Sequence, residues 1–242
     1  MLDLRNISKR FGGVIALDDV TFSVGDGEIV GLMGANGAGK TTLLAVIAGN
    51  SRPKSGDVIW RGKSLLGLRP DQIARRGIAR TFQVVRPFLG LTVLENAGIA
   101  ARFGARALTR ASDVDAAARD ALRAVHLAGR AGDLASELTL SDQKRLEIAR
   151  ALATGAALLL LDEVMAGLTP TEVREMIEII RSLRNDRGLT LIVIEHVMRA
   201  LMSLSDRIVV LHLGRRIAEG PPSVIADDPQ VSHVYFGSHA NA

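Results

Sequence analysis

Apolar and polar residues change their spacing along the chain, and the first region has the spacing of strands. Val20–Val24 alternates between apolar and polar residues and is followed by a Gly-Asp-Gly turn signal, which is typical of a strand that ends in a tight turn. Glu28–Met33 is a short apolar run, which predicts a buried strand. Another strand and turn are predicted at Val58–Gly62. Residues 1 to about 60 are therefore predicted to be rich in strands.

From about residue 87 to residue 154 the spacing becomes that of helices. Thr92–Glu95 has the order of a capping box, in which a threonine and a glutamate satisfy the first turn of a helix. A further helix, which we expect Gly129 to end, carries one apolar stripe made of Val114, Ala118, Ala121, Leu122 and Val125. This region is predicted to be an inserted helical segment.

Beyond this segment the pattern alternates between strands and a helix. Leu158–Leu161 and Leu191–Ile194 are apolar runs that predict buried strands. Thr169–Glu172 is expected to cap the helix between them. One face of that helix is expected to carry Val173, Met176, Ile177, Ile180 and Leu183. Strand–helix–strand crossovers build parallel sheets, and residues 207–219 then read as a terminal hairpin.

A glycine-rich segment with a clear chemical meaning follows the strand Glu28–Met33. It reads Gly-Ala-Asn-Gly-Ala-Gly-Lys-Thr-Thr and satisfies the pattern G-x-x-x-x-G-K-[ST], ahead of the helix-compatible run Thr41–Ala48. Its glycines let backbone N–H groups point at phosphate oxygens, and the following helix adds its dipole. Lys40 is expected to reach the β- and γ-phosphates of a nucleotide, and the Thr41 hydroxyl to ligate Mg²⁺. The nucleotide-binding residues are predicted to be Gly34, Asn36, Gly37, Ala38, Gly39, Lys40, Thr41 and Thr42.

Two acidic residues follow the strand Leu158–Leu161. Asp162 is predicted to hold Mg²⁺ through its water shell, and Glu163 to polarise the attacking water as a general base. The alternative is an acidic helix cap after an ordinary strand, which the glycine-rich segment upstream makes the weaker interpretation. His196 lies just after Leu191–Ile194, at the strand end where parallel sheets bind ligands. It is predicted to contact the γ-phosphate or position the water, although a lone histidine is often structural.

These features together predict an α/β fold with a P-loop NTPase core. We expect a mixed β-sheet flanked by helices, an antiparallel N-terminal β-subdomain and an inserted helical subdomain at about residues 87–154. The whole chain, residues 1–242, is expected to be one domain whose C-terminal hairpin and tail begin at about residue 206.

The composition of the chain argues against several classes of protein. The chain lacks cysteine, which excludes disulfides and thiolate metal sites. The net charge of +4 comes from scattered basic residues, and eight aromatic residues are too few for a base-stacking nucleic-acid surface. Met1–Arg5 lacks the pattern of a signal peptide, and the longest apolar run, Ala156–Leu161, is far shorter than the roughly 20 residues that cross a bilayer. We therefore expect a soluble, cytoplasmic protein.

With these motifs in place, the chain resembles an ABC-type ATPase over essentially its whole length. The resemblance implies ATP and Mg²⁺ as cofactors, with Asp162 as the metal aspartate, Glu163 as the catalytic glutamate and His196 as the switch histidine. It also implies that Phe11 stacks on adenine, and that Gln83 contacts Mg²⁺ and water and senses a transmembrane partner. Lys40, Gln83, Glu163 and His196 are the expected catalytic residues, and Thr41, Gln83 and Asp162 the expected metal ligands.

The signature sequence departs from the family pattern Leu-Ser-Gly-Gly-Gln. Ile148-Ala149-Arg150 sets the register, so that the signature here reads Leu-Thr-Leu-Ser-Asp at residues 138–142. Thr139 keeps the hydroxyl that contacts the ATP of a partner subunit, whereas Ser141, expected at the same ATP, replaces a glycine, and Asp142 introduces a carboxylate. Two hypotheses follow: a weakened ATP site in a heterodimer, or a variant that the subfamily tolerates.

Several stretches resemble the branched-chain amino-acid uptake group, among them residues 77–83, 91–96, 166–170 and 234–237. The resemblance implies an ATP-hydrolysing subunit on the inner face of a cell membrane. Its partners would be a second ATPase subunit, identical or distinct, two permease subunits and an external solute-binding protein, and nucleic acid is not expected. The alternatives are lipopolysaccharide export, a soluble DNA- or ribosome-associated ATPase, or a non-hydrolysing regulatory subunit. The cargo itself, for which branched-chain amino acids, amides and urea are candidates, is chosen by the other subunits.

Overall fold

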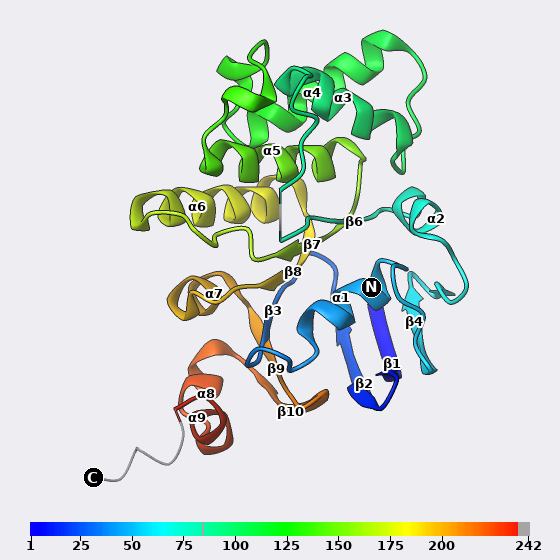
Figure 1. The fold of residues 1–242 in the computed structure, drawn as a ribbon, viewed down its shortest axis with the longest axis vertical. Helices are drawn as coiled ribbons and strands as arrows, with labels where there is room; N and C mark the ends of the chain where they lie inside the picture. The colour runs from blue at the N-terminus through cyan, green and yellow to red at the C-terminus, as the bar shows by residue number, and fades with distance from the viewer. Residues whose placement is uncertain (84, 237–242) are drawn as a thin grey trace. The chain divides into compact units, whose positions relative to one another are not determined.

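The computed structural model describes residues 1–83 and 85–236, which form two compact units. The first unit contains residues 1–69 and the chain from residue 192 onward, and the second contains residues 70–191. Figure 1 follows the chain through both. The expected C-terminal tail continues past the described residues, as does Gly237 of the stretch 234–237.

The first unit begins with an antiparallel sheet, as the alternating pattern predicts. Its strand order is β2 (Val14–Val24), β1 (Leu2–Phe11), β4 (Ser55–Trp60), β5 (Lys63–Ser64). Leu2 pairs with Val24 and Leu4 with Phe22, and all four side chains are buried on one face. The sequence alternation therefore reports which face of this sheet meets the core.

A second set of strands in this unit carries the glycine-rich segment. The buried strand β3 (Ile29–Met33) pairs in parallel with β9 (Arg207–His212), which pairs antiparallel with β10 (Arg215–Gly220). The predicted C-terminal hairpin is thus confirmed. The boundary between the units falls within β8 (Thr190–Ile194). The helices of this unit are α1 (Lys40–Ile47), α7 (Met198–Leu204), α8 (Pro222–Ala226) and α9 (Pro229–Phe236).

The second unit combines two parallel strands with helices. β6 (Ile78–Arg80) pairs in parallel with the fully buried β7 (Leu158–Asp162). Its helices are α2 (Pro70–Arg75), α3 (Val93–Phe103), α4 (Ala111–Ala124), α5 (Leu140–Ala153) and α6 (Pro170–Arg187). Short 3₁₀ turns at Ala128–Arg130 and Ala135–Glu137 lead into α5.

Both predicted capping boxes are confirmed. The Thr92 hydroxyl accepts from the Glu95 N–H at 3.1 Å, and the Glu95 carboxylate accepts from the Thr92 N–H at 2.8 Å. Thr169 and Glu172 make the same reciprocal pair at the start of α6. Each box satisfies N–H groups that the first turn of a helix leaves without partners.

Two details of the helix predictions are wrong. α4 ends at Ala124 rather than near Gly129, because His126 takes a left-handed backbone (φ 61°) and Gly129 lies within a 3₁₀ turn. Burial of Val125 and Leu127 on either side stabilises this early end. On α6, Ile179 is buried although it was not assigned to the core face, whereas Val173 and Ile177 are only half-buried. The buried stripe is therefore rotated slightly around the helix.

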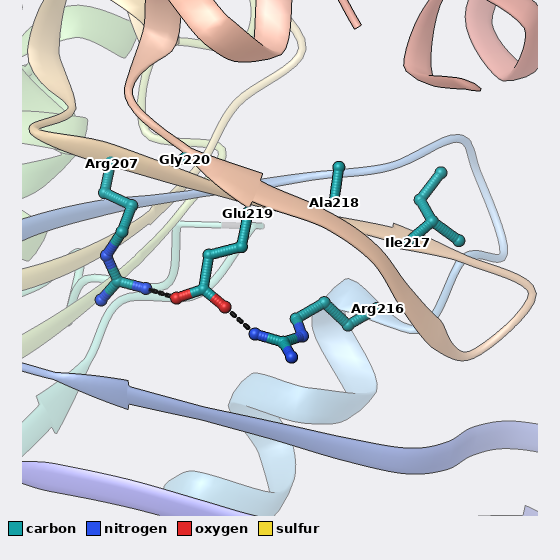
Figure 2. A pocket seen from close by; sticks show the side chains of 6 residues that line it. All are labelled: Arg207, Arg216, Ile217, Ala218, Glu219 and Gly220. Atoms are coloured by element: carbon teal, nitrogen blue, oxygen red, sulfur yellow. Dashed lines mark hydrogen bonds and ion pairs between the residues drawn. The ribbon is translucent and has the colours of Figure 1, made fainter. Parts of the chain in front are cut away.

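An ion-pair network joins the two sheets of the first unit. Glu219 lies between Arg207 and Arg216 and pairs with both, in a pocket on β9 and β10 (Figure 2). Arg207 also donates to both carboxylate oxygens of Glu28, at 2.9 and 3.1 Å, and to the Ser23 carbonyl at 2.7 Å. Burial by itself would raise the pKa of Glu28, but the hydrogen bonds from Arg207 and the Gly25 N–H lower that pKa below its ordinary value of 4.5.

This lowered pKa predicts a pH-dependent contribution to stability. Because the folded-state pKa of Glu28 lies below the unfolded value, its stabilisation is present above the unfolded pKa and is lost as the pH falls through the folded pKa. We expect Glu28→Gln to lower the free energy of unfolding at neutral pH, with the difference from wild type shrinking below about pH 4. Urea denaturation across this range measures it, and a pH-independent difference would contradict the assignment.

Candidate functional site

The glycine-rich segment connects β3 to α1, and its backbone explains why glycine is required there. A Cβ on Gly34 would meet the Leu211 carbonyl oxygen at 2.6 Å, and one on Gly39 would meet the Ala16 carbonyl oxygen at 2.5 Å. Gly39 also has φ 105°, a conformation that other residues rarely adopt. The strands behind the loop therefore press closely against it, while residues 35–37 remain exposed.

Lys40 and the start of α1 place positive charge at this loop. The Lys40 side chain is buried, and its ammonium donates to the carbonyl oxygens of Gly34 at 2.5 Å and Ala35 at 3.1 Å. α1 has no side-chain cap at its N-terminus, where the helix dipole is positive. Thr41 is exposed beside it and Thr42 is half-buried. This arrangement suits an anionic ligand such as a phosphate.

The end of β7 in the second unit carries Asp162, which is only 1% exposed. Its Oδ2 accepts from the Arg80 guanidinium at 2.8 Å, and its backbone N–H donates to the Thr81 hydroxyl at 3.1 Å. Within the described part of the chain, Oδ1 is buried and has no hydrogen-bond partner. A buried carboxylate oxygen without a partner is costly, and a cation or its bound water would satisfy it. Asp162 therefore fits the role of a metal ligand.

Glu163 and Gln83 meet next to Asp162. The Gln83 amide donates to Glu163 Oε2 at 2.8 Å, although the two residues lie 80 positions apart. Glu163 has a left-handed backbone with φ 53°, which is strained for a residue other than glycine. Its carbonyl oxygen accepts from the Lys144 ammonium at 2.8 Å. The side chains of Gln83 and Lys144 thus both bind Glu163 at the end of the strand.

The signature sequence occupies the start of α5. Thr139 is exposed and caps the helix, since its hydroxyl oxygen accepts from the Asp142 N–H at 3.2 Å, which leaves its own O–H able to donate. Ser141 is 4% exposed, and its buried hydroxyl has no partner within the described residues. Asp142 accepts from Arg130 at 2.6 Å, and Arg130 also donates to Asp133 at 2.7 Å and to the Glu137 carbonyl at 3.2 Å.

Phe11 and His196 belong to the same unit as the glycine-rich segment. Phe11 ends β1 with 54% of its surface exposed, and the Lys9 ammonium lies 4.8 Å from its ring centroid. His196 is exposed just after β8. Gln83, Asp162 and Glu163 belong to the other unit, together with the signature residues.

Sequence reasoning missed four charged residues that hold the second unit's site residues in place. They are Arg80, Arg130, Lys144 and Glu147. Lys144 and Glu147 are buried on α5 at a spacing of three residues, and charged residues among the apolar positions of a helix are a signal that points to such a role. Arg80 and Arg130 carry no comparable signal, because their partners lie 82 and 12 residues away.

Within residues 1–83 and 85–236, no three His, Asp or Glu side chains gather as ligands for a metal ion. Nor does that part of the chain include a helix that is long and apolar enough to span a membrane.

The sequence and the fold are similar to those of known proteins. Residues 17–166 match the family described as ABC transporter. The chain is 40% identical to the high-affinity branched-chain amino acid transport ATP-binding protein LivG of Escherichia coli (strain K12) over 98% of each chain. It is 36% identical, with the same coverage, to the corresponding protein BraF of Pseudomonas aeruginosa. A solved ATP-binding cassette of an ABC transporter in its ADP conformation superposes with a TM-score of 0.87, with 29% identity over 98% of each chain.

The contribution of the Arg130–Asp142 ion pair to stability can be tested by substitution. We expect Arg130→Ala to lower the urea midpoint of unfolding, because it leaves the half-buried Asp142 carboxylate without its cation. Adding Asp142→Asn to that variant is expected to recover part of the loss, since the carboxylate is then absent. Arg123→Ala, which removes an exposed arginine of the same unit, is the control. Additive effects of the two substitutions would show that the pair is not coupled.

Proposed function

The chain belongs to the ABC transporter family, and we propose that it binds and hydrolyses ATP to power a transporter in a membrane. The observation that carries the proposal is the end of β7, where Asp162 has a buried oxygen without a hydrogen-bond partner among the described residues and Glu163 pairs with Gln83. Such an arrangement is suited to phosphoryl transfer to water, in which the protein positions charge and orients the water.

ATP would bind to the glycine-rich segment. The N–H groups of residues 34–42 and the start of α1 would surround its phosphates, and Lys40 would exchange its loop carbonyls for β- and γ-phosphate oxygens. The exposed Phe11 ring offers an apolar face on which adenine would stack.

Asp162, Thr41 and Gln83 would hold the magnesium ion that accompanies ATP. When bound, Mg²⁺ would supply positive charge to the phosphate oxygens. Glu163 would then accept a proton from the attacking water, and His196 would hold that water or the γ-phosphate in place. In the structure Oε2 of Glu163 accepts from Gln83, which orients the carboxylate so that Oε1 would accept the proton, or Oε2 once Gln83 releases it.

Two subunits would combine to complete each ATP site. Thr139 has its O–H free to donate to the γ-phosphate on a second subunit, and Ser141 lies next to it in the same helical turn. Residues 87–154, which include this helix, would form the inserted helical subdomain. The Arg130 guanidinium offsets the charge of Asp142, which favours the hypothesis of a tolerated signature over that of a weakened site.

The names of the relatives support the transport role. LivG and BraF are described as ATP-binding proteins of high-affinity branched-chain amino acid transport. We infer that this chain serves an importer of branched-chain amino acids or related small polar solutes. It would work on the cytoplasmic face of the cell membrane with two permease subunits, a second ATPase subunit and an external solute-binding protein.

Nucleotide binding is tested by Lys40→Ala. We expect this variant to bind Mg-ATP about 10- to 100-fold more weakly, because a charge-assisted hydrogen bond contributes about 1.5–3 kcal/mol. Isothermal titration calorimetry measures the affinity, and Lys63→Ala, which alters an exposed lysine of the same unit, is expected to match the wild type. Equal affinities of the wild type and Lys40→Ala would remove Lys40 from the site.

Hydrolysis is tested separately by Glu163→Gln. The amide cannot accept the proton of the attacking water, so we expect turnover to fall by a factor of about 10²–10⁴ while ATP binding is retained. Phosphate release at saturating Mg-ATP measures turnover. Glu178→Gln makes the same change at an exposed site and serves as the control. If Glu163→Gln turned over ATP at the wild-type rate, another group would have to be the base.

A further inference from the structure

Glu147 is a buried carboxylate that the proposed reaction does not use. It lies on α5 and is 7% exposed, and both of its oxygens accept from the backbone of the segment that contains Gln83. Its Oε1 also lies 3.9 Å from the Arg150 guanidinium. Oε2 accepts from the Phe82 N–H at 3.1 Å and Oε1 from the Arg86 N–H at 3.3 Å. Arg150, one turn further along α5, donates to the Arg86 carbonyl at 3.0 Å. The two ends of the segment 82–86 are thus attached to a single helix.

Burying the Glu147 carboxylate costs free energy, which the contacts it makes must offset. The residues around Glu147 on the helix, Leu146, Ile148 and Ala149, are fully buried and apolar. An apolar residue at position 147 would avoid removing a carboxylate from water, which costs free energy even when the charge is paired. It would, however, leave the segment 82–86 without its acceptors. The carboxylate therefore ties down the backbone next to Gln83.

The same helix also holds Glu163. Lys144, one turn before Glu147, donates its ammonium to the Glu163 carbonyl at 2.8 Å, and the Glu163 carboxylate accepts from Gln83 at 2.8 Å. The contacts form a closed ring that runs from Glu147 through residues 82–86 to Gln83, then to Glu163, and back to α5 through Lys144. All of these residues lie within one compact unit.

We propose that Glu147 is a positioning residue, which with Lys144 makes the Gln83–Glu163 pair follow the movement of α5. This inference rests on the proposed ATPase function. The N-terminus of α5 carries Thr139, which would contact ATP on a second subunit. When that contact forms, any displacement of α5 is transmitted to the Gln83 backbone through Glu147 and to the Glu163 backbone through Lys144. The positions of Gln83 and Glu163 are therefore coupled to engagement of the signature.

Two substitutions at position 147 separate this role from simple packing. Glu147→Gln keeps the size of the side chain but offers one oxygen where two are needed, so that its NH₂ group faces a backbone N–H that also donates. It releases one end of the segment 82–86. Glu147→Ala releases both ends. Glu178→Gln, which removes the same charge from an exposed ion pair of α6, is the matched control.

The first measurement is ATP hydrolysis by the full-length chain as a function of ATP concentration. We expect Glu147→Gln to lower kcat about tenfold and Glu147→Ala to lower it further, because misplacing a catalytic group costs turnover. KM for ATP should stay within about twofold, since the glycine-rich segment and Lys40 are unchanged. Glu178→Gln should match the wild type in both quantities.

The second measurement is limited chymotrypsin digestion of the nucleotide-free chain. Phe82 and Phe103 are 53% and 68% exposed, and only Phe82 belongs to the segment that Glu147 holds. Cleavage after Phe82 should accelerate in both Glu147 variants, while cleavage after Phe103 stays at the wild-type rate. A general loss of stability would accelerate both cuts, so Phe103 is an internal control.

The outcomes are distinguishable. Lower kcat at constant KM, together with faster cleavage after Phe82 alone, supports the proposal. It is overturned if both Glu147 variants keep the wild-type kcat, or if cleavage accelerates equally at both phenylalanines. Failure of the wild type itself to hydrolyse ATP would overturn the proposed function, and the positioning role with it, whatever the digestion shows.

Discussion

Burial of charge at the end of β7 is the constraint around which the second unit is organised. A carboxylate in this environment is stable only when it is paired or hydrogen-bonded. Arg80 satisfies one oxygen of Asp162, Gln83 satisfies one oxygen of Glu163, and Lys144 satisfies the strained Glu163 backbone. The other Asp162 oxygen is the one buried acceptor of this strand end that the described residues leave without a hydrogen bond. This strand end therefore keeps one buried carboxylate oxygen that a cation or its bound water would satisfy.

The first unit instead concentrates positive charge, at the glycine-rich segment and the start of α1. Most of this arrangement depends on the backbone. Glycines at 34 and 39 let β9 and β2 lie against the loop, and α1 begins without a side chain that would compete for its N–H groups. Lys40 is already at the loop, bonded to carbonyl oxygens that a phosphate would replace. A basic loop of this kind suits the phosphates of a nucleotide.

In the altered signature, the structure pairs a charge that the sequence alone would leave unpaired. The sequence predicts that Asp142 brings a negative charge toward the phosphates of a second subunit. In the structure Arg130 takes up that charge, and the same guanidinium also binds Asp133 and the Glu137 carbonyl. Thr139, meanwhile, keeps its hydroxyl at the exposed end of α5. The carboxylate at position 142 is therefore paired with a cation of its own chain.

Features that depend on neighbouring residues were determined by the sequence alone. The strand before the glycine-rich segment, the helix after it and both capping boxes are set by hydrogen bonds and backbone angles within a few residues, and the family was evident from the same motifs. The end of α4 was not, because burial of Val125 and Leu127 outweighed the glycine signal at 129. The pairing of Gln83 with Glu163, and the attachment of residues 82–86 to Glu147, join positions 80 and 65 residues apart. Only the tertiary structure decided these contacts, since no local preference of the chain specifies which distant groups meet when a charge must be buried.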